Sequence, residues 1–384
     1  MATDMQLTIP MPLQIIVDDV GWWSGQDGSQ FNQPYRTGIG RDHQPEDYLA
    51  LAALGKGLGM KILAGFVLCE WDKANLLRKL PSSTWMGEDW NNAGIRPAHK
   101  ERAADILRRS QANIEIGLHG IGHELWVDGR MQRAEFHNQH CEMRDKDEIR
   151  RHLDFFLQLM EQYKLSPAPV SFIPPALKHS FGNGEEGFQK LLEEFGIRYV
   201  ATHFDKARQF SAPLHPQLTW ENNVLLVDRE KAESAWNATA CEPAFAFDRP
   251  FLTLHWANIL HHDPAKNLDV VRRWIDFIRE GSKKQRILLA RDTQSCLSQY
   301  LHRMFSTVHE QNGEFSIDLT WKNDLPRHLI DHSFFVELTP SPITDFKIYG
   351  ADAECIRNTV GSTIFQITPQ SGLTKILLGP GQEM

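Results

Sequence analysis

The chain has 384 residues, of which 41% are hydrophobic and 23% charged, a composition typical of a globular protein with a large apolar core. Its formal net charge is −8 at pH 7 and no basic run is present, so a nucleic-acid partner is not expected. No apolar stretch reaches membrane-spanning length, so a membrane partner is not expected either.

The first expected strand, residues 13–17, is apolar and ends in Asp18-Asp19. Adjacent carboxylates at the end of a buried strand are costly unless a cation compensates them, and a metal or a substrate is the usual reason. A solvated pair in a loop is the alternative. The polar, Gly-rich segment 21–42 follows, where an α/β fold places substrate contacts.

Up to about residue 308, expected strands alternate with amphipathic helices, which indicates a parallel sheet or barrel. The expected strands are 13–17, 61–68, 114–118, 170–173, 197–202, 224–227, 251–254 and 286–290. The expected helices are 46–56, 99–110, 145–163, 185–195, 268–279 and 295–308, with Gly57, Gly196 and Gly281 as helix stops.

From about Asn312 the pattern changes to short strands between Pro, Gly and Asn turns. These strands are expected at 315–319, 334–338, 345–349, 363–367 and 374–378. The predicted organisation is an α/β catalytic domain over residues 1–311 and a small β-sandwich-like accessory domain over residues 312–384.

The segment 113–124 reads Asn-Ile-Glu-Ile-Gly-Leu-His-Gly-Ile-Gly-His-Glu, an alternating strand that runs into His119 and His123. Gly120 and Gly122 argue against a helix and allow a curled loop in which both imidazoles converge. Imidazole is the commonest metal ligand in proteins, and zinc sites combine such nitrogens with a carboxylate. Two satisfied, partly exposed histidines are the alternative for an isolated motif of this kind.

The five cysteines are scattered, odd in number and without C-x-x-C spacing, which disfavours a disulfide framework or a cysteine-ligated zinc. Residues 1–14 have neither the basic nor the apolar region of a signal peptide, so a cytoplasmic location is the default expectation. A processed secretory protein would look the same. The sequence does not indicate an oligomeric state.

Taken in order, these motifs resemble the polysaccharide deacetylase family, the NodB-homology domain of carbohydrate esterase family 4. They are the strand into Asp18-Asp19, the segment from Glu115 to His123, the turn Pro174-Pro175 after a long helix, and Leu252-Thr-Leu-His255. The resemblance covers roughly residues 13–308. It implies a distorted (β/α) barrel with the site at the carboxyl ends of the strands.

The resemblance also implies a role for each matching residue. Asp19, His119 and His123 would hold a divalent metal ion, with zinc the expected one. Asp18 would be the base that deprotonates the attacking water, and His255 the acid that protonates the leaving group. The backbone N–H of Ala176, after the Pro-Pro turn, would help to hold the oxyanion.

Aromatic faces suit sugar rings, so the residues beside these motifs are expected to bind substrate. They are Trp22, Trp23, Trp256 and Asn258. The chain departs from the family where Ile173 stands in place of an arginine that pairs with the base carboxylate, and where Ala176 stands in place of an aromatic residue. Candidates for the missing cation are Arg36, Arg41 and Lys178.

The sequence therefore predicts a metal-dependent hydrolase that removes an acyl group, expected to be acetyl, from a carbohydrate or other acylated small molecule. Two alternatives remain. One is a glycoside hydrolase on a related metal-containing barrel, and the other is a carbohydrate-binding protein with a degenerate site. The presence of Asp18, Asp19, His119, His123 and His255 together argues against the second.

Overall fold

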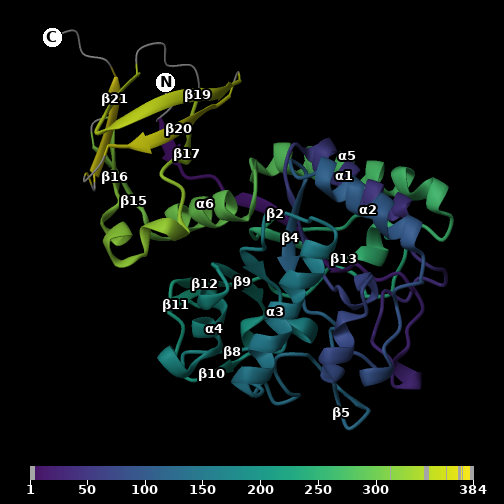
Figure 1. The fold of residues 1–384 in the computed structure, drawn as a ribbon. Coiled ribbons are helices and arrows are strands. Elements are labelled where there is room, and N and C mark those ends of the chain that lie inside the picture. The colour runs from purple at the N-terminus through teal and green to yellow at the C-terminus, as the bar shows by residue number, and fades with distance from the viewer. Residues whose placement is uncertain are drawn as a thin grey trace. The chain divides into compact units, whose positions relative to one another are not determined.

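The computed structural model describes residues 5–311, 313–340, 346–359, 361–370, 373 and 375–380 and is drawn in Figure 1. The chain divides into two compact units. The larger comprises Gln14–Ala246 and Phe251–Glu280, and the smaller comprises Met1–Leu13, Phe247–Pro250 and Gly281–Met384. No helix in the described part of the chain is long and apolar enough to cross a membrane.

The larger unit is built on one sheet with the strand order β11-β12-β9-β7-β4-β3-β2-β13. Every neighbouring pair is parallel except β11 and β12. The strands are β2 (Pro12–Val20), β3 (Ile62–Phe66), β4 (Ile114–Leu118), β7 (Ser171–Phe172), β9 (Tyr199–Thr202), β11 (Leu218–Glu221), β12 (Val224–Asp228) and β13 (Phe251–His255). This confirms the expected α/β class and places each strand except β11, which the sequence did not predict, within a few residues of its predicted position. The expected strand 286–290 is the short β14 (Leu288–Leu289), which pairs in parallel with β2.

The sheet differs from the predicted barrel in that it stays open. No pairing joins β11 to β13 among the described residues. The flanking helices are α1 (Pro45–Leu58), α2 (Pro97–Arg109), α3 (Lys146–Gln162), α4 (Phe188–Glu194) and α5 (Asn267–Gln285). Helix α1 packs against α2 and against β3 and β4. Short strand pairs complete the unit: β5 (Leu125–Val127) with β6 (Arg130–Gln132), and β8 (Ser180–Phe181) with β10 (Arg208–Gln209).

The smaller unit contains two four-stranded antiparallel sheets, ordered β1-β17-β20-β19 and β15-β16-β21-β18. Its elements are β1 (Gln6–Thr8), β14 (Leu288–Leu289), α6 (Thr293–Phe305), β15 (Thr307–Gln311), β16 (Glu314–Asp318), β17 (Phe334–Thr339), β18 (Phe346–Tyr349), β19 (Ala351–Asn358), β20 (Thr363–Pro369) and β21 (Lys375–Pro380). Side chains of both sheets share one apolar core, which includes Ile317, Val336, Ile367 and Ile376.

This unit begins earlier than the predicted boundary. Strand β15 pairs with β16, and the amino-terminal β1 pairs with β17, so residues on both sides of the expected 311/312 division belong to the same β structure. The sequence pattern did not predict strand β15 because this strand carries mostly polar, exposed residues. Asn312, Asp345 and Thr374, which the predicted boundaries include, lie outside the described residues.

Gly281 does not end a helix as predicted, because α5 continues to Gln285. A Cβ atom at position 281 would lie 2.1 Å from Cζ of Phe247. The glycine therefore allows an aromatic ring to approach the helix backbone closely.

Candidate metal centre and active site

The two aspartates of β2 reach the same cavity because the strand is irregular there. Successive side chains of a regular strand point to opposite faces. Here the pairing of β2 with β3 shifts register between Val17 and Val20, and Asp19 has a φ of 64°, in the left-handed region. As a result, Asp18 and Asp19 both line one cavity, although the sequence predicts the strand to end before them.

The loop that follows β4 is held by one buried carboxylate, Glu135. It accepts the backbone N–H groups of Ile121 at 2.8 Å and of Gly122 and His123 at 3.0 Å each. Gly120 makes this approach possible, since its φ is 108° and a Cβ there would lie 2.3 Å from Oε2 of Glu135. The loop curls as the sequence predicts.

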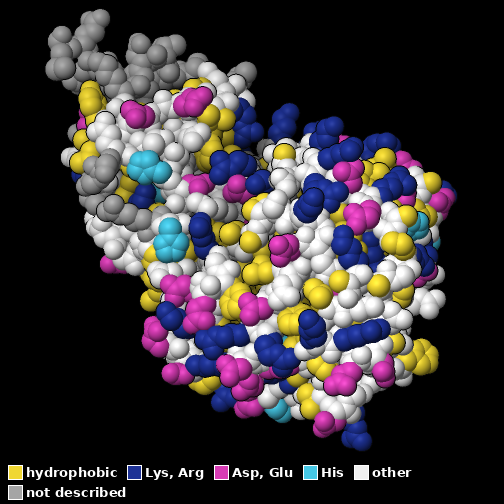
Figure 2. Space-filling model, in the orientation of Figure 1, with side chains coloured by type: hydrophobic (Ala, Val, Ile, Leu, Met, Phe, Trp, Pro, Cys, Tyr) yellow, Lys and Arg dark blue, Asp and Glu magenta, His cyan; other side chains and the backbone are white. Residues whose placement is uncertain are grey.

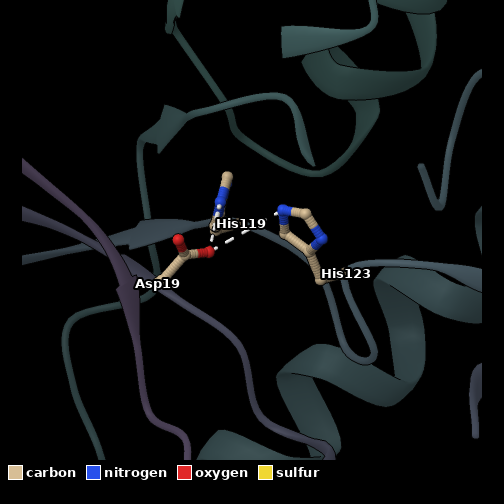
Figure 3. A group of neighbouring side chains, drawn as sticks. All are labelled: Asp19, His119 and His123. Carbon is tan, nitrogen blue, oxygen red and sulfur yellow. Dashed lines mark ion pairs between the residues drawn. The ribbon is translucent and has the colours of Figure 1, made fainter. Parts of the chain in front are cut away.

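Asp19, His119 and His123 converge, as Figure 3 shows. One potential ligand atom from each lies within 4.8 Å of the others, and all three side chains are buried. Oδ1 of Asp19 lies 3.4 Å from Nε2 of His119 and 3.7 Å from Nε2 of His123. Among the described residues this oxygen has no hydrogen-bond partner.

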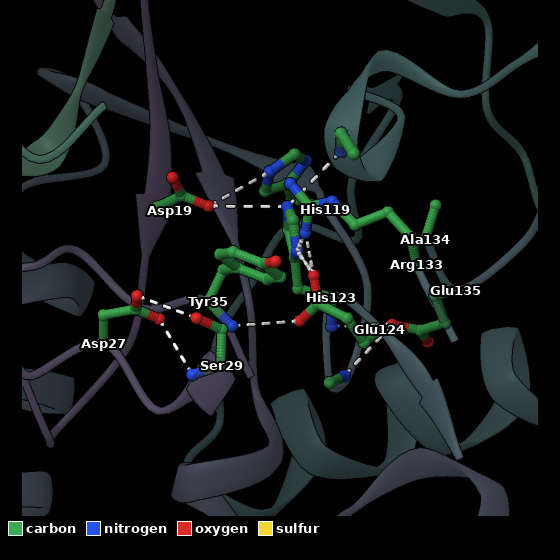
Figure 4. A network of polar contacts seen from close by, with 12 residues as sticks. Asp19, Asp27, Ser29, Tyr35, His119, His123, Glu124, Arg133, Ala134 and Glu135 are labelled. Atoms are coloured by element: carbon green, nitrogen blue, oxygen red, sulfur yellow. Dashed lines mark hydrogen bonds and ion pairs between the residues drawn. The ribbon is translucent and has the colours of Figure 1, made fainter. Parts of the chain in front are cut away.

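The partners of the two imidazoles fix which nitrogens face Asp19 (Figure 4). Nδ1 of His119 lies 2.7 Å from the carbonyl oxygen of Ile173, and Nδ1 of His123 lies 2.6 Å from Oε1 of Glu124. Both of these oxygens only accept, so each Nδ1 donates to one of them, and in the neutral imidazole this leaves the lone pair on Nε2. A carboxylate or carbonyl behind a histidine is the usual arrangement at protein metal sites.

These residues therefore fit a divalent cation. They offer one buried carboxylate oxygen and two oriented imidazole nitrogens, and three protein ligands leave positions for water and substrate. Burial opposes ionisation of Asp19, but the neighbouring imidazoles of His119 and His123, when they carry a proton, outweigh it and hold its pKa well below the usual range. The carboxylate is thus in the form that binds metal.

Asp18 is neutralised by a cation that the sequence analysis missed. Nη1 and Nη2 of Arg229 donate to its two carboxylate oxygens at 2.8 and 2.6 Å, and both side chains are buried. Burial would raise the pKa of Asp18, but the charge and hydrogen bonds of Arg229 outweigh burial and lower it. A bidentate pair of this kind fixes the orientation of the carboxylate.

The three predicted substitutes for the missing arginine were wrong. Each has another partner: Arg36 pairs with Glu70, Arg41 with Asp47, and Lys178 donates to the carbonyl oxygen of Gln139. A signal for Arg229 did exist, because the apolar run 224–227 is followed by Asp228-Arg229, just as 13–17 is followed by Asp18-Asp19.

His255 ends β13, where it stands opposite Asp18 in the strand register. Its backbone N–H donates to Oδ1 of Asn258 at 2.8 Å. Burial lowers the pKa of the imidazole, and the nearby positive charges of Arg229 and His119 add to this, although Asp18 and Asp19 oppose it. The side chain lines the same cavity as the triad.

Ala176 lies in a tight turn after Pro174-Pro175, with a φ of 53°. Its backbone N–H donates to Nε2 of His123 at 3.3 Å. This N–H therefore points toward the position where the three candidate ligands meet.

The predicted substrate contacts require correction. Trp22, Trp23, Trp256 and Asn258 are at most 2% exposed, and none lines the cavity. Trp256 stacks on His43 with ring centroids 4.1 Å apart, and Asn258 donates to the carbonyl oxygens of Ala235 and Ala238. These residues support the walls of the site. Tyr35 and Trp236 are the aromatic residues that line the cavity.

The cavity has a volume of about 290 Å³. Its lining residues are Asp18, Asp19, Tyr35, His119, His123, Arg133, Pro174, Ala176, Leu177, Lys206, Arg229, Lys231, Ala232, Trp236 and His255. All five side chains that the sequence marks as chemically active, together with Ala176, thus meet around one space.

Comparison with known proteins gives structural similarities alone. No protein-family model and no curated protein sequence matches this chain. A polysaccharide deacetylase structure from Mycobacterium smegmatis is similar, with 14% identity, a TM-score of 0.41, and coverage of 73% of this chain and 87% of that one. A family 4 carbohydrate esterase from Streptomyces lividans, solved in complex with acetate, has 10% identity, a TM-score of 0.34, and coverage of 73% and 92%.

We predict that the protein binds one zinc or similar divalent ion, with ligand atoms about 2.0–2.3 Å from the metal. His119→Ala and Asp19→Ala should each abolish stoichiometric binding, measured by metal analysis after dialysis and by calorimetry. His140→Ala, which removes an exposed histidine, is the matched control and should retain the metal. Full metal content in both ligand variants would contradict the assignment.

Proposed function

We propose that this protein is a metal-dependent hydrolase that removes an acyl group, in the first place acetyl, from a carbohydrate or a related substrate. One observation carries the proposal: the Asp19–His119–His123 triad, the Asp18–Arg229 pair and His255 line a single cavity. These groups are a candidate metal site, a candidate base and a candidate acid, the set that acyl hydrolysis needs.

A divalent ion bound by the triad would supply Lewis-acid chemistry, polarising a carbonyl and activating water. The protein's own groups do the rest. Asp18, ionised beside Arg229, keeps unshared electron pairs on both oxygens and accepts a proton from the attacking water. The N–H of Ala176 donates to the oxygen that gains charge, and His255 gives a proton to the departing amine or alcohol.

The same lining residues weaken the glycosidase alternative. Glycoside hydrolases use two carboxyl groups as acid and as nucleophile or base. Asp18 and Asp19 are the carboxyl groups that line the described cavity. Asp18 is bound to Arg229, Asp19 lies against two imidazoles, and the pKa values of both are lowered, so neither is suited to donate a proton. Release of acetate from acetylated oligosaccharides, without cleavage of nitrophenyl glycosides, would distinguish the two functions.

The Asp18→Asn variant should lose activity while it retains the metal. A general base contributes roughly 10²–10⁴-fold to the rate, so kcat for acetate release should fall by about that factor. Near-full activity with metal bound would remove Asp18 from the role of base. Metal content measured on the same sample separates this loss from loss of the ion.

Arg229 should control the pH at which activity appears. Because Arg229 lowers the pKa of Asp18, Arg229→Met should raise that pKa and move the acidic limb of the kcat/KM profile to higher pH. Arg229→Lys should move it less, since it restores the charge without the bidentate geometry. An unchanged limb in both variants would show that Asp18 is not the titrating base.

His255 should matter most where the leaving group needs a proton. The pKa of His255 lies below the ordinary value of 6.5, so its protonated form becomes abundant only at a lower pH than for an ordinary histidine. We expect kcat/KM for unactivated amides or esters, relative to aryl acetates, to rise as pH falls toward that pKa. His255→Ala should remove this dependence and lower activity on the unactivated substrates most. Equal losses on both classes would exclude the acid role.

A further inference from the structure

Cationic side chains are concentrated at the cavity of a protein whose net charge is −8. Arg133, Lys206, Arg229 and Lys231 line it, against the carboxylates of Asp18 and Asp19. On the face drawn in Figure 2, by contrast, cationic and anionic side chains are intermingled. The lining of the cavity thus carries more cationic than anionic side chains.

The four cations differ in what they contact. Arg229 is bound to Asp18, and Arg133 contacts Glu124 and covers the ring of Tyr35 at 4.2 Å. The ammonium groups of Lys206 and Lys231 have no ion-pair or hydrogen-bond partner within the described part of the chain. Both lysines are exposed. Their acidic neighbours in sequence, Asp205 and Glu230, do not line the cavity.

The fold explains why these lysines occur together. Strands β9 and β12 are parallel neighbours, with Thr202 opposite Asp228. Lys206 follows the end of β9 and Lys231 follows the end of β12. Both are thus at the carboxyl edge of the sheet, where Asp228 is already paired with His203. Both ammonium groups, without a partner among the described residues, thus lie beside the cavity.

The cavity also has an aromatic wall. Tyr35 and Trp236 line it, with ring centroids 6.2 Å apart in an edge-to-face arrangement. Aromatic faces suit sugar rings, and free ammonium groups suit an anion.

We propose that the substrate is an acylated sugar that carries an anionic group, a carboxylate or a phosphate, which Lys206 and Lys231 bind while the acyl group reaches the triad. This inference rests on the proposed hydrolase function and specifies its substrate class. Lysines at the rim select among substrates by charge, and they attract the anion more weakly as salt increases.

The test compares matched substrates. One pair is an acetylated uronic-acid oligosaccharide and the same compound with its carboxylates converted to carboxamides, and a second pair is an acetylated sugar with and without a phosphate. The kcat/KM for the anionic member of a pair, divided by that for its neutral member, should exceed one for at least one pair. This ratio should fall as the salt concentration rises. Exposed ion pairs are weak, so each Lys→Met variant should lower that ratio roughly two- to fivefold, and the double variant roughly 4- to 25-fold. The pair that responds identifies the anion.

Lys266→Met removes an exposed lysine that does not line the cavity and should leave the ratio unchanged. Equal kcat/KM values for both members of each pair, unaffected by the double variant, would overturn the inference while leaving the hydrolase function intact. If no acetate is released, calorimetry with the deacetylated compounds decides the question. Tighter, lysine-dependent binding of the anionic member would support the inference even as the hydrolase proposal fails, and equal binding of both members would overturn it.

Discussion

The geometry of the site depends on the buried carboxylate of Glu135. It holds the backbone of the loop between His119 and His123, and it is itself held by His152, whose Nδ1 lies 2.7 Å from Oε1. Burial opposes protonation of His152, but contacts with Glu135 and Glu148 outweigh it and raise its pKa. When His152 is protonated the two form a buried ion pair, and loss of one partner of such a pair typically costs about 3–5 kcal/mol. The loop that carries both imidazoles is therefore anchored to helix α3.

The parts of the site that the sequence could predict are those encoded by local spacing. His119 and His123 are four residues apart with glycines between them, and Asp18 and Asp19 follow an apolar strand, so their chemistry is visible in short segments. Arg229 lies 211 residues from Asp18, and which cation completes that pair depends on strand β12 lying near β2 across the folded sheet. The run into Asp228-Arg229 marks Arg229 as a candidate, but no local pattern says that it lies beside Asp18.

The tryptophans show a second limit of what the sequence can predict about the site. Composition indicated aromatic side chains for sugar binding, but it cannot say which face of a loop is buried. Trp22 and Trp85 pack on the guanidinium of Arg36, with its Cζ 5.5 and 4.9 Å from their ring centroids, while Arg36 pairs with Glu70. Glu70 also accepts the backbone N–H groups of Trp23 and Ser24. These aromatic rings pack within a long irregular segment, and the aromatic side chains that line the cavity are instead those of Tyr35 and Trp236.

Each buried carboxylate around the site has a cation or hydrogen-bond donors beside it, with the exception of Asp19. Asp18 has Arg229, Glu135 has His152 and three backbone donors, and Glu124 has His123, Arg133 and the backbone N–H of Tyr35. Asp19 is equally buried, yet its Oδ1 makes no hydrogen bond among the described residues, and the two imidazoles that face it, when neutral, turn lone pairs toward it. An ionised carboxylate in that setting is costly unless a cation balances it. The protein supplies a cation or donors for the other three, and we propose that a metal ion completes the pattern at Asp19.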